Sequence, residues 1–453
     1  MPLQKNQVLT LRVERLSSDG SGVAHSPDGE TVFIPGAAPG DEARVRIVKD
    51  CKRYAFGILD EVLTPSPDRI PVDCAVAGPC GGCSLRHLDY AAELRAKQEN
   101  VADAFARIGG LDVPVLPIVG SPEVNRYRNK VQFPVGVDKS GKPCIGFYAG
   151  RTHRIVPCPD CRLQPGVLNE IGNALCAFFA EKGIQPYSEE TGRGLVRHIF
   201  LRRGAHSGQI MVCLVCTCAK LPCAEELCTR LKAQFAEITT ILLNVNAKNT
   251  NVILGTETHT LYGPGYIEDT LCGVPVQLGP LSFYQVNTLA AEQLYGIAAQ
   301  YAQLTPDDLL LDLYCGMGTI GLSMAAHCRE LIGVEIVPEA IESAKANAAR
   351  MGADVAAKSR FFCADAGQAA TRLAAEGLHP DIVMLDPPRK GCDEATLSAV
   401  VRMAPRRVVY VSCNPATAAR DAAWLEQNGY HAEKVQPVDL FPRTRHCECV
   451  IAL

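Results

Sequence analysis

The chain contains 453 residues, of which 47% are hydrophobic and 21% charged, and its formal net charge at pH 7 is −4. This length predicts two to four domains with a full-sized hydrophobic core. Because no apolar run reaches roughly eighteen residues and the first residues lack the pattern of a signal peptide, we expect a cytoplasmic protein without a membrane partner. The negative net charge argues against indiscriminate binding to nucleic acid but permits a local basic groove.

Short β-rich runs occupy residues 6–63, where turns rich in glycine, aspartate and proline separate them. Five such runs in about sixty residues predict a small β-barrel of the oligonucleotide-binding type. A proline-rich linker follows at 64–71. The motif GSGVA (20–24) and the run VFIPGAAPGDE (32–42) resemble the TRAM domain, which is found at the start of many RNA-modifying enzymes. We therefore expect an OB-like TRAM barrel for RNA binding over residues 1–66.

The middle of the chain predicts a β-rich central domain over residues 67–270. It opens with an amphipathic helix at 90–110, which we expect to pack with the C-terminal domain. The run 197–215 has a glycine-bearing turn between two apolar stretches and predicts a β-hairpin. Helical patterns interrupt the strands at 165–183 and 224–238.

The C-terminal part alternates between buried strands and helices, which predicts a doubly wound, mostly parallel α/β sheet over residues 271–453. We expect this Rossmann-like domain to form the catalytic part of the protein. The predicted strands are LLLDLYC (309–315), ELIGVEIV (330–337), SRFFCADA (359–366), PDIVMLDPP (380–388), RRVVYVSC (406–413) and CECVIAL (447–453).

A glycine-containing loop, DLYCGMGTIGL, joins a strand to a helix through Gly316 and Gly318. Such glycines let the backbone approach a nucleotide at the carboxyl edge of a sheet. The glycine spacing also fits a generic NAD site. However, Glu335 ends the next strand, where a carboxylate can bind both ribose hydroxyls, and Asp365 ends the third, where it can accept a bond from an adenine amine. With Asp386 in LDPPRKG, this series resembles class I S-adenosylmethionine-dependent methyltransferases.

Two residues near the end of the chain suit the methylation of a pyrimidine ring carbon. Cys413 lies in VVYVSCNPAT and Glu448 in HCECV. Addition of a thiolate to C6 of the base turns C5 into an enolate that can attack a methyl donor. A general base must then remove the C5 proton to expel the thiolate. The alternatives are a buried structural thiol at Cys413 and an ordinary surface carboxylate at Glu448.

The ordered motifs FYQVN (283–287), DLYCGMGT, LDPPRKG, SCNPAT and HCECV resemble the RNA uracil-C5-methyltransferase family over essentially the whole chain. The resemblance implies that Cys413 is the nucleophile and Glu448 the base. It also implies a set of residues that contact the methyl donor: Gln285, Tyr314, Glu335, Asp365 and Asp386. Thr319 stands where the family motif CGxGN has asparagine, and a threonine hydroxyl can still bond at a helix start.

Cysteines with metal-ligand spacing form a second candidate site. Cys74, Cys80 and Cys83 have C-x5-C-x2-C spacing, with the last two in PCGGC, and a fourth ligand must come from VPCPDCRLQP, through Cys158 or Cys161. Four thiolates suit either zinc or an iron–sulfur cluster, and the spacing alone favours neither. The family resemblance implies a 4Fe-4S cluster with Cys161, which precedes the Leu-Gln pair, as its fourth ligand.

Together these patterns predict a monomeric enzyme that makes 5-methyluridine in 23S ribosomal RNA, with transfer RNA as the alternative substrate. An amino-group methyltransferase and a non-catalytic RNA-binding iron–sulfur protein are alternatives from other classes. Three clusters of basic residues predict an RNA-binding face. They are Arg126, Arg128 and Lys130; Arg193, Arg197, His198, Arg202 and Arg203; and Arg443, Arg445 and His446.

Overall fold

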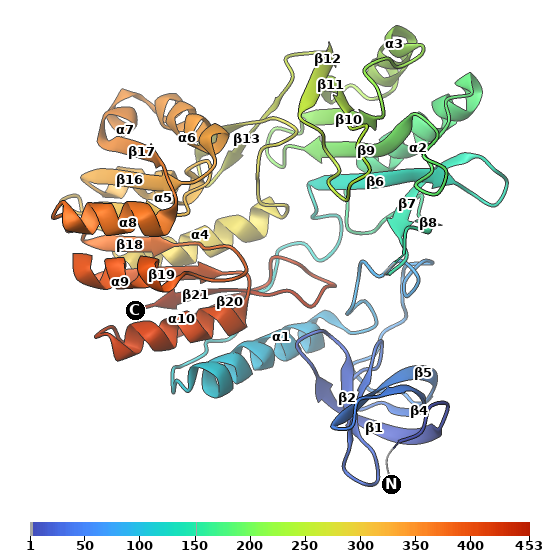
Figure 1. Ribbon diagram of the computed structural model, residues 1–453, viewed down its shortest axis with the longest axis horizontal. Helices are drawn as coiled ribbons and strands as arrows, with labels where there is room; N and C mark the ends of the chain where they lie inside the picture. Colours follow the sequence, from blue (N-terminus) through green and yellow to red (C-terminus); the bar gives the residue numbers. More distant parts are fainter. Residues whose placement is uncertain (1–2, 151) are drawn as a thin grey trace.

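The computed structural model describes residues 3–150 and 152–453, which form three lobes (Figure 1). The N-terminal lobe is a closed barrel with the strand order β1-β2-β3-β5-β4, as predicted. In β4 the side chains of Ala43, Val45 and Ile47 point into the barrel and alternate with exposed residues, because successive side chains of a strand face opposite ways. The strands are β1 (Val8–Leu16), β2 (Gly22–His25), β3 (Thr31–Ile34), β4 (Glu42–Asp50) and β5 (Tyr54–Thr64).

The central lobe is built on a seven-stranded sheet with the order β12-β11-β10-β9-β6-β7-β8. The predicted hairpin is confirmed, since β9 and β10 pair in antiparallel fashion. Helices α2 and α3 pack together on one face of the sheet. The elements are β6 (Lys130–Val137), β7 (Pro143–Tyr148), β8 (Ile155–Pro157), α2 (Gly166–Lys182), β9 (Val196–Arg203), β10 (Ile210–Cys216), α3 (Ala224–Gln234), β11 (Ile238–Val245) and β12 (Glu257–Tyr262).

The other face of the central sheet shares one hydrophobic core with the C-terminal lobe. Phe200 and Met211 of this sheet belong to the same buried cluster as Leu294 of α4 and Val409 of β19. A two-stranded sheet, β13 (Ile267–Leu271) and β14 (Val274–Leu278), lies at this junction. Its first strand includes position 270, where the sequence predicted the end of the central domain. The segment 279–287 then leads from β14 into α4.

The C-terminal sheet has the order β17-β16-β15-β18-β19-β21-β20, with its first five strands parallel, as the strand–helix alternation predicted. Helices α4 and α5 contribute to the core on one face, and α8, α9 and α10 to the core on the other. The strands are β15 (Leu309–Leu313), β16 (Glu330–Glu335), β17 (Ser359–Cys363), β18 (Ile382–Leu385), β19 (Arg407–Ser412), β20 (Lys434–Val438) and β21 (Glu448–Ala452). The helices are α4 (Thr288–Ala302), α5 (Thr319–Met324), the 3-10 turn η2 (Ala325–His327), α6 (Pro338–Met351), α7 (Ala353–Lys358), α8 (Ala366–Ala375), α9 (Glu394–Met403) and α10 (Pro415–Gln427).

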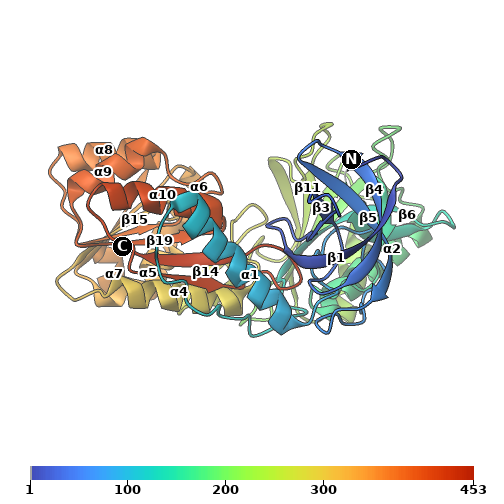
Figure 2. The ribbon, with the colours of Figure 1, turned by 90° about the horizontal axis from the view of Figure 1, so that it is seen from below.

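Helix α1 (Tyr90–Ala104), which ends in the π-helical turn η1 (Phe105–Gly109), connects the lobes. It packs against α10 and β20, and Figure 2 shows it running from the C-terminal lobe toward the barrel. Its buried Lys97 donates to Glu93 (2.7 Å) and to Asp439 (2.8 Å), in the segment that leads to β21. This buried ion network fixes the helix to the C-terminal lobe. No helix in the described part of the chain is long and apolar enough to cross a bilayer.

Candidate active site and cysteine cavity

Cys413 and Glu448 lie opposite each other at the carboxyl end of β19. Cys413 directly follows β19, and Glu448 is the first residue of the antiparallel strand β21. Ser412 pairs with Cys449, so the same register continued by one residue sets Cys413 across from Glu448. Directly opposed residues of antiparallel strands have Cα atoms about 5 Å apart. Two residues far apart in the sequence are thereby brought together by strand pairing.

Burial controls the protonation of this pair. Glu448 is only 6% exposed, and burial, reinforced by the Asp386 carboxylate, raises its pKa from 4.5 to about 8. Burial, together with the charges of Glu448 and Asp386, also raises the pKa of the Cys413 thiol. Because the charge of Asp386 raises the pKa of both Cys413 and Glu448, the three side chains belong to one site. A carboxyl group with a pKa near neutrality is suited to proton transfer.

Arg389, which the sequence analysis did not single out, is the cation beside the thiol. It hydrogen-bonds to Cys413 and opposes the rise in the pKa of this thiol. Its Nη2 also donates to Nδ1 of His446 (2.8 Å). Burial and the charge of Arg389 lower the pKa of His446 to about 4, so this ring is neutral. The Arg389 carbonyl accepts a bond from Asn414 Nδ2 (2.9 Å), which ties LDPPRKG to SCNPAT. Arg389 lies shortly after the buried strand β18, and this position is the sequence feature that could have identified it.

The glycine-containing loop that joins β15 to α5 has the backbone conformation that its glycines allow. Tyr314, Gly316 and Gly318 have φ angles of 67°, 56° and 79°. A Cβ on Gly318 would come within 3.1–3.3 Å of three neighbouring side chains, and its φ is positive, so glycine is strongly favoured there. The Gly316 N–H donates to Glu335 Oε2 (3.2 Å), and the Val337 N–H donates to Oε1 (3.0 Å). The Glu335 carboxylate is therefore fixed beside the loop.

Two further carboxylates stand at the same edge of the sheet. Asp365 follows β17 and begins α8, where its side chain accepts a bond from the Gln368 N–H (3.1 Å). Asp386 follows β18 and is partly buried, and burial raises its pKa to about 7. In a parallel sheet the carboxyl ends of the strands form the ligand-binding edge. The predicted acidic residues of the donor site are thus gathered along one edge.

Tyr295 of α4 connects two of the remaining predicted donor residues, Gln285 and Thr319, and was not found from the sequence. Its hydroxyl lies 3.4 Å from the Thr319 hydroxyl and also hydrogen-bonds to Gln285. Burial, then Asp386, raises the pKa of Tyr295, so it stays neutral. Thr319 is the first residue of α5 and is 8% exposed. The threonine that replaces the usual asparagine therefore has a hydroxyl partner.

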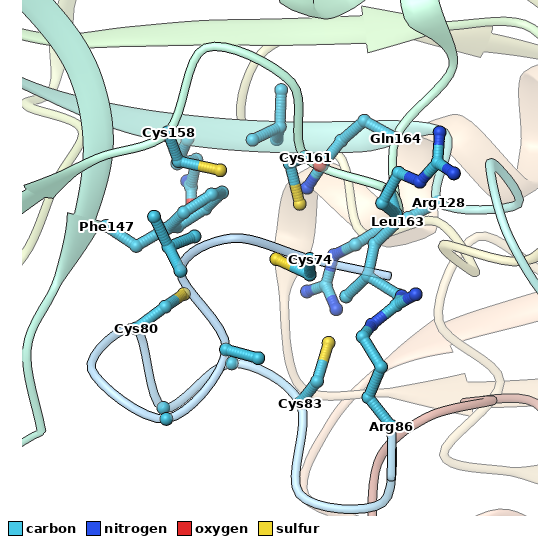
Figure 3. A pocket seen from close by; sticks show the side chains of 18 of the residues that line it. Cys74, Cys80, Cys83, Arg86, Arg128, Phe147, Cys158, Cys161, Leu163 and Gln164 are labelled. Atoms are coloured by element: carbon cyan, nitrogen blue, oxygen red, sulfur yellow. The ribbon is translucent and has the colours of Figure 1, made fainter. Parts of the chain in front are cut away.

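A separate cavity of about 260 Å³ is lined by the cysteines with metal-ligand spacing. Cys74, Cys80 and Cys83 come from the segment between the barrel and α1, and Cys158 and Cys161 from the segment between β8 and α2. Figure 3 shows the five sulfur atoms directed into this cavity. Nevertheless, the described residues include no group of three or more Cys, His, Asp or Glu side chains arranged to hold a metal ion.

The two cysteines of CPDC differ in their surroundings. Cys161 hydrogen-bonds to Cys158 and to the N–H groups of Leu163 and Gln164, and despite burial its pKa is lowered to about 7. The bond to Cys161, followed by burial, raises the pKa of Cys158. Backbone N–H groups directed at a sulfur favour the thiolate form. Cys161 is therefore better suited than Cys158 to serve as a thiolate ligand.

Arg86 is a buried cation at the same cavity, and its side chain is 3% exposed. Its Nη1 donates to Asp73 (2.7 Å) and to Asn125 Oδ1 (3.1 Å), and its charge opposes the rise in pKa that burial causes in Cys83. The Nε and Nη2 atoms have no hydrogen-bond partner among the described residues. Unpartnered donors beside several thiols fit a negatively charged group in the cavity. The donor set and this cation are thus compatible with a thiolate-bound cluster.

The prediction of an RNA-binding face is wrong for three of the five residues in the basic cluster of the β9–β10 hairpin, because their side chains are buried. Arg197, His198 and Arg202 are 4%, 5% and 1% exposed, because β9 is an interior strand of the central sheet. Arg443 is also buried and donates to the Leu88 carbonyl (2.8 Å). A positively charged residue in the sequence can donate hydrogen bonds, but its charge does not show whether the side chain is exposed. Arg197, Arg202 and Arg443 bind backbone carbonyls inside the protein instead of phosphates outside it.

Known proteins resemble this chain along its whole length. The family profile described as TRAM domain matches residues 2–59, and the profile tRNA (Uracil-5-)-methyltransferase matches residues 277–453. A protein of Halalkalibacterium halodurans, named an uncharacterized RNA methyltransferase, is 43% identical over 100% of this chain and 98% of its own. A Listeria monocytogenes protein of the same description is 42% identical over 100% and 98%. The fold, the site and these relatives define an RNA methyltransferase.

A solved structure indicates which kind of RNA methyltransferase this chain resembles. The tRNA (uracil-54, C5)-methyltransferase of Pyrococcus abyssi, determined with S-adenosyl-L-homocysteine, superposes with a TM-score of 0.78 at 26% identity, covering 99% of this chain and 100% of that one. Together with the matching profiles, this similarity identifies the family. The chain belongs to the RNA uracil-C5-methyltransferase family.

Proposed function

We propose that this protein transfers a methyl group from S-adenosylmethionine to C5 of a uridine in RNA through a covalent adduct with Cys413. The observation that carries the proposal is the placement of Cys413 across from Glu448, beside Asp386 and Arg389. A thiol and a carboxyl group at the ligand-binding edge of a methyltransferase sheet match the two needs of C5 methylation. An amino-group methyltransferase needs neither residue.

The chemistry follows from the surroundings of these side chains. Arg389 stabilises the Cys413 thiolate, which adds its electron pair to C6 of the uracil, so that C5 becomes an enolate carbon. C5 attacks the sulfonium-bound methyl group, and the donor leaves as S-adenosylhomocysteine. Glu448 then takes the proton from C5, the C5–C6 double bond re-forms, and the Cys413 thiolate departs. Each turnover returns both residues to their starting states once Glu448 releases its proton to solvent.

We assign the donor site to the residues along the neighbouring strand ends. We assign Glu335, held by the Gly316 and Val337 N–H groups, to the ribose hydroxyls. We assign Asp365 to the adenine amine and Asp386 to the part of the site beside the reacting pair, because its charge acts on Glu448. The complete assigned set is Gln285, Tyr314, Thr319, Glu335, Asp365 and Asp386. The complex of the Pyrococcus abyssi enzyme with S-adenosyl-L-homocysteine supports this choice of donor.

We propose 23S ribosomal RNA as the substrate and transfer RNA as the second candidate. The cysteine cluster and the barrel suggested a ribosomal target. However, a transfer-RNA methyltransferase aligns with 99% of this chain, so the overall architecture does not distinguish the two. Mass mapping of methylated uridines in both RNAs decides between them, in a deletion strain complemented with the wild-type protein or with Cys413→Ala. A modification restored only by the wild-type protein identifies the target.

The barrel is expected to supply much of the affinity for RNA. The substrate phosphates are negative and the protein carries a net charge of −4, so binding depends on local cationic contacts that weaken steeply with salt. Deletion of residues 1–66 should weaken binding to a folded ribosomal RNA fragment and leave the affinity for S-adenosylhomocysteine unchanged. Filter binding at several salt concentrations measures the first quantity and calorimetry the second. Equal RNA binding by the truncated and full-length proteins would rule out a recognition role for the barrel.

We further propose that the cysteine cavity holds a 4Fe-4S cluster bound by Cys74, Cys80, Cys83 and Cys161. The thiol donor set and the unpartnered atoms of Arg86 support this assignment. The cavity lies in the central lobe and shares no lining residue with the methylation site, so the cluster would serve structure or RNA contact.

Iron analysis tests this assignment. Protein purified without oxygen is expected to be brown and to contain about four irons per chain. Cys80→Ser should lose the colour and the iron. Cys161→Ser should also lose them, whereas Cys158→Ser, the matched change three residues away, should keep them. A colourless protein with one zinc per chain would refute the cluster. Loss of iron in Cys158→Ser but not in Cys161→Ser would make Cys158 the fourth ligand.

A further inference from the structure

Arg202 is a buried cation that has no carboxylate partner among the described residues. It lies on β9, is 1% exposed, and its guanidinium group is 5.4 Å from the centre of the Phe200 ring. Nη1 donates to the Gly279 carbonyl (2.8 Å) and Nη2 to the Ser282 carbonyl (2.8 Å). Burial lowers its pKa to about 10, so it remains charged at neutral pH. Burial of a charged arginine without a counter-ion costs free energy. Such a residue is therefore expected to have a role that outweighs this cost.

The two acceptor carbonyls belong to the segment 279–287, which we call the donor loop. It joins β14 to α4 and contains Gln285, whose side chain meets Tyr295 at the proposed methyl-donor site. It also contains Phe283, which is 75% exposed. The loop thus contributes one side chain to the donor site and presents another to solvent beside it. Its conformation determines where both side chains point.

The second half of the donor loop has its own anchor in the central lobe. Asn129, which precedes β6, donates through Nδ2 to the Gln285 carbonyl (2.8 Å) and to the Thr288 hydroxyl (3.0 Å). Its backbone N–H donates to the Val286 carbonyl (2.8 Å). Strands β6 and β9 are neighbours, and Lys130 pairs directly with Arg202. Adjacent strands of one sheet therefore hold the two halves of the loop.

We propose that Arg202 is a positioning residue for methyl-donor binding, which makes the central lobe a part of the donor site. The inference rests on the proposed function of Gln285. The planar guanidinium group bridges two carbonyls three residues apart with two charge-assisted hydrogen bonds, which a lysine cannot reproduce. Without this bridge the loop samples other conformations, and donor binding must then include the free-energy cost of ordering it.

The same strand offers a matched control. Arg197 is also buried, at 4% exposure, and also donates to backbone carbonyls, those of Asn246 (3.1 Å) and Lys248 (2.6 Å). It pairs with Glu189 as well (3.0 Å). Its acceptors lie in the segment between β11 and β12, which contributes no residue to the proposed donor site. A change at Arg197 therefore reports the cost of losing a buried arginine of β9 without disturbing the donor loop.

The test compares Arg202→Met with Arg197→Met in the full-length protein. Calorimetry measures the affinity for S-adenosylhomocysteine, and thermal unfolding measures stability. Both variants are expected to unfold at lower temperature than the wild type. Only Arg202→Met should bind the ligand more weakly, by about tenfold or more, while Arg197→Met should stay within about twofold of the wild type. Equal affinities in the two variants would overturn the proposal.

Two additional measurements keep the outcome interpretable. If either methionine variant does not fold, the pair Arg202→Lys and Arg197→Lys replaces it, because lysine keeps the charge but reaches only one carbonyl. Weaker ligand binding in Arg202→Lys alone supports the positioning role, and unchanged binding contradicts it. Failure of the wild-type protein to bind S-adenosylhomocysteine would instead contradict the proposed function of the donor site itself.

Discussion

Replacement of Cys413 by alanine is expected to abolish methylation of uridine and covalent trapping on RNA that contains 5-fluorouridine. The C5 carbon becomes nucleophilic only after a thiolate has added to C6, so no other residue can supply this step. Removal of a catalytic nucleophile lowers turnover on the order of 10⁴- to 10⁶-fold. Transfer of labelled methyl groups and gel detection of the RNA–protein adduct measure the two outcomes.

Cys218→Ala is the control for Cys413→Ala. Cys218 is exposed in the central lobe and its sulfur contacts only the Lys220 carbonyl among the hydrogen bonds of the described residues, so its loss should leave both activities intact. Cys413 is itself partly exposed, and its replacement should not change the unfolding temperature greatly. Near wild-type turnover in Cys413→Ala would exclude the covalent mechanism and would favour methylation of an exocyclic amine.

The edge that carries the proposed donor site was predictable because strands of a parallel sheet end on the same side. Glu335 ends its strand, Asp365 and Asp386 follow theirs, and the structure gathers the three along one edge. The pairing of Cys413 with Glu448 could not be derived from spacing, since it depends on β21 folding back antiparallel to β19. Motif resemblance, and not periodicity, connected these two residues.

Other features escaped because the sequence does not reveal burial or long-range partners. Strand β20 was not predicted: it contains Pro437, which interrupts a strand pattern and is tolerated here because β20 is at the edge of the sheet. The arginines of β9 were assigned to a solvated RNA-binding face because charge suggests exposure. Helix α4 and its Tyr295 were not predicted, and only the packing of α4 against α5 shows the link between Tyr295 and Thr319.

The substitution Glu448→Gln is expected to separate the two halves of the reaction. Addition of Cys413 and methyl transfer precede removal of the C5 proton, so both should still occur, and a methylated RNA–protein adduct should accumulate. Loss of a general base lowers turnover by roughly 10²- to 10⁴-fold. Mass spectrometry of the trapped adduct shows whether the methyl group is present. A folded variant that forms no adduct with substrate RNA would show that Glu448 does not act as the base.

The pH dependence of the wild-type protein gives an independent test of the same residue. Glu448 must be ionised to accept the proton, and burial raises its pKa to about 8, so adduct breakdown should accelerate as the pH rises from 6 to 9. Stability should change in the opposite direction. Between pH 4.5 and about 8 the folded protein retains a proton that the unfolded chain has released, so the free energy of unfolding falls as the pH rises through this window.

Glu448→Gln removes this contribution because glutamine does not titrate. The variant should therefore gain stability relative to the wild type as the pH increases, by on the order of a few kcal/mol at pH 9, with little difference at pH 4. Denaturant unfolding at both pH values measures the change. Asp386, whose pKa is also raised by burial, remains in the variant and keeps part of the pH dependence. A stability difference that does not vary with pH would mean that Glu448 is ionised in the resting enzyme, and that the proposed protonation state of the base is wrong.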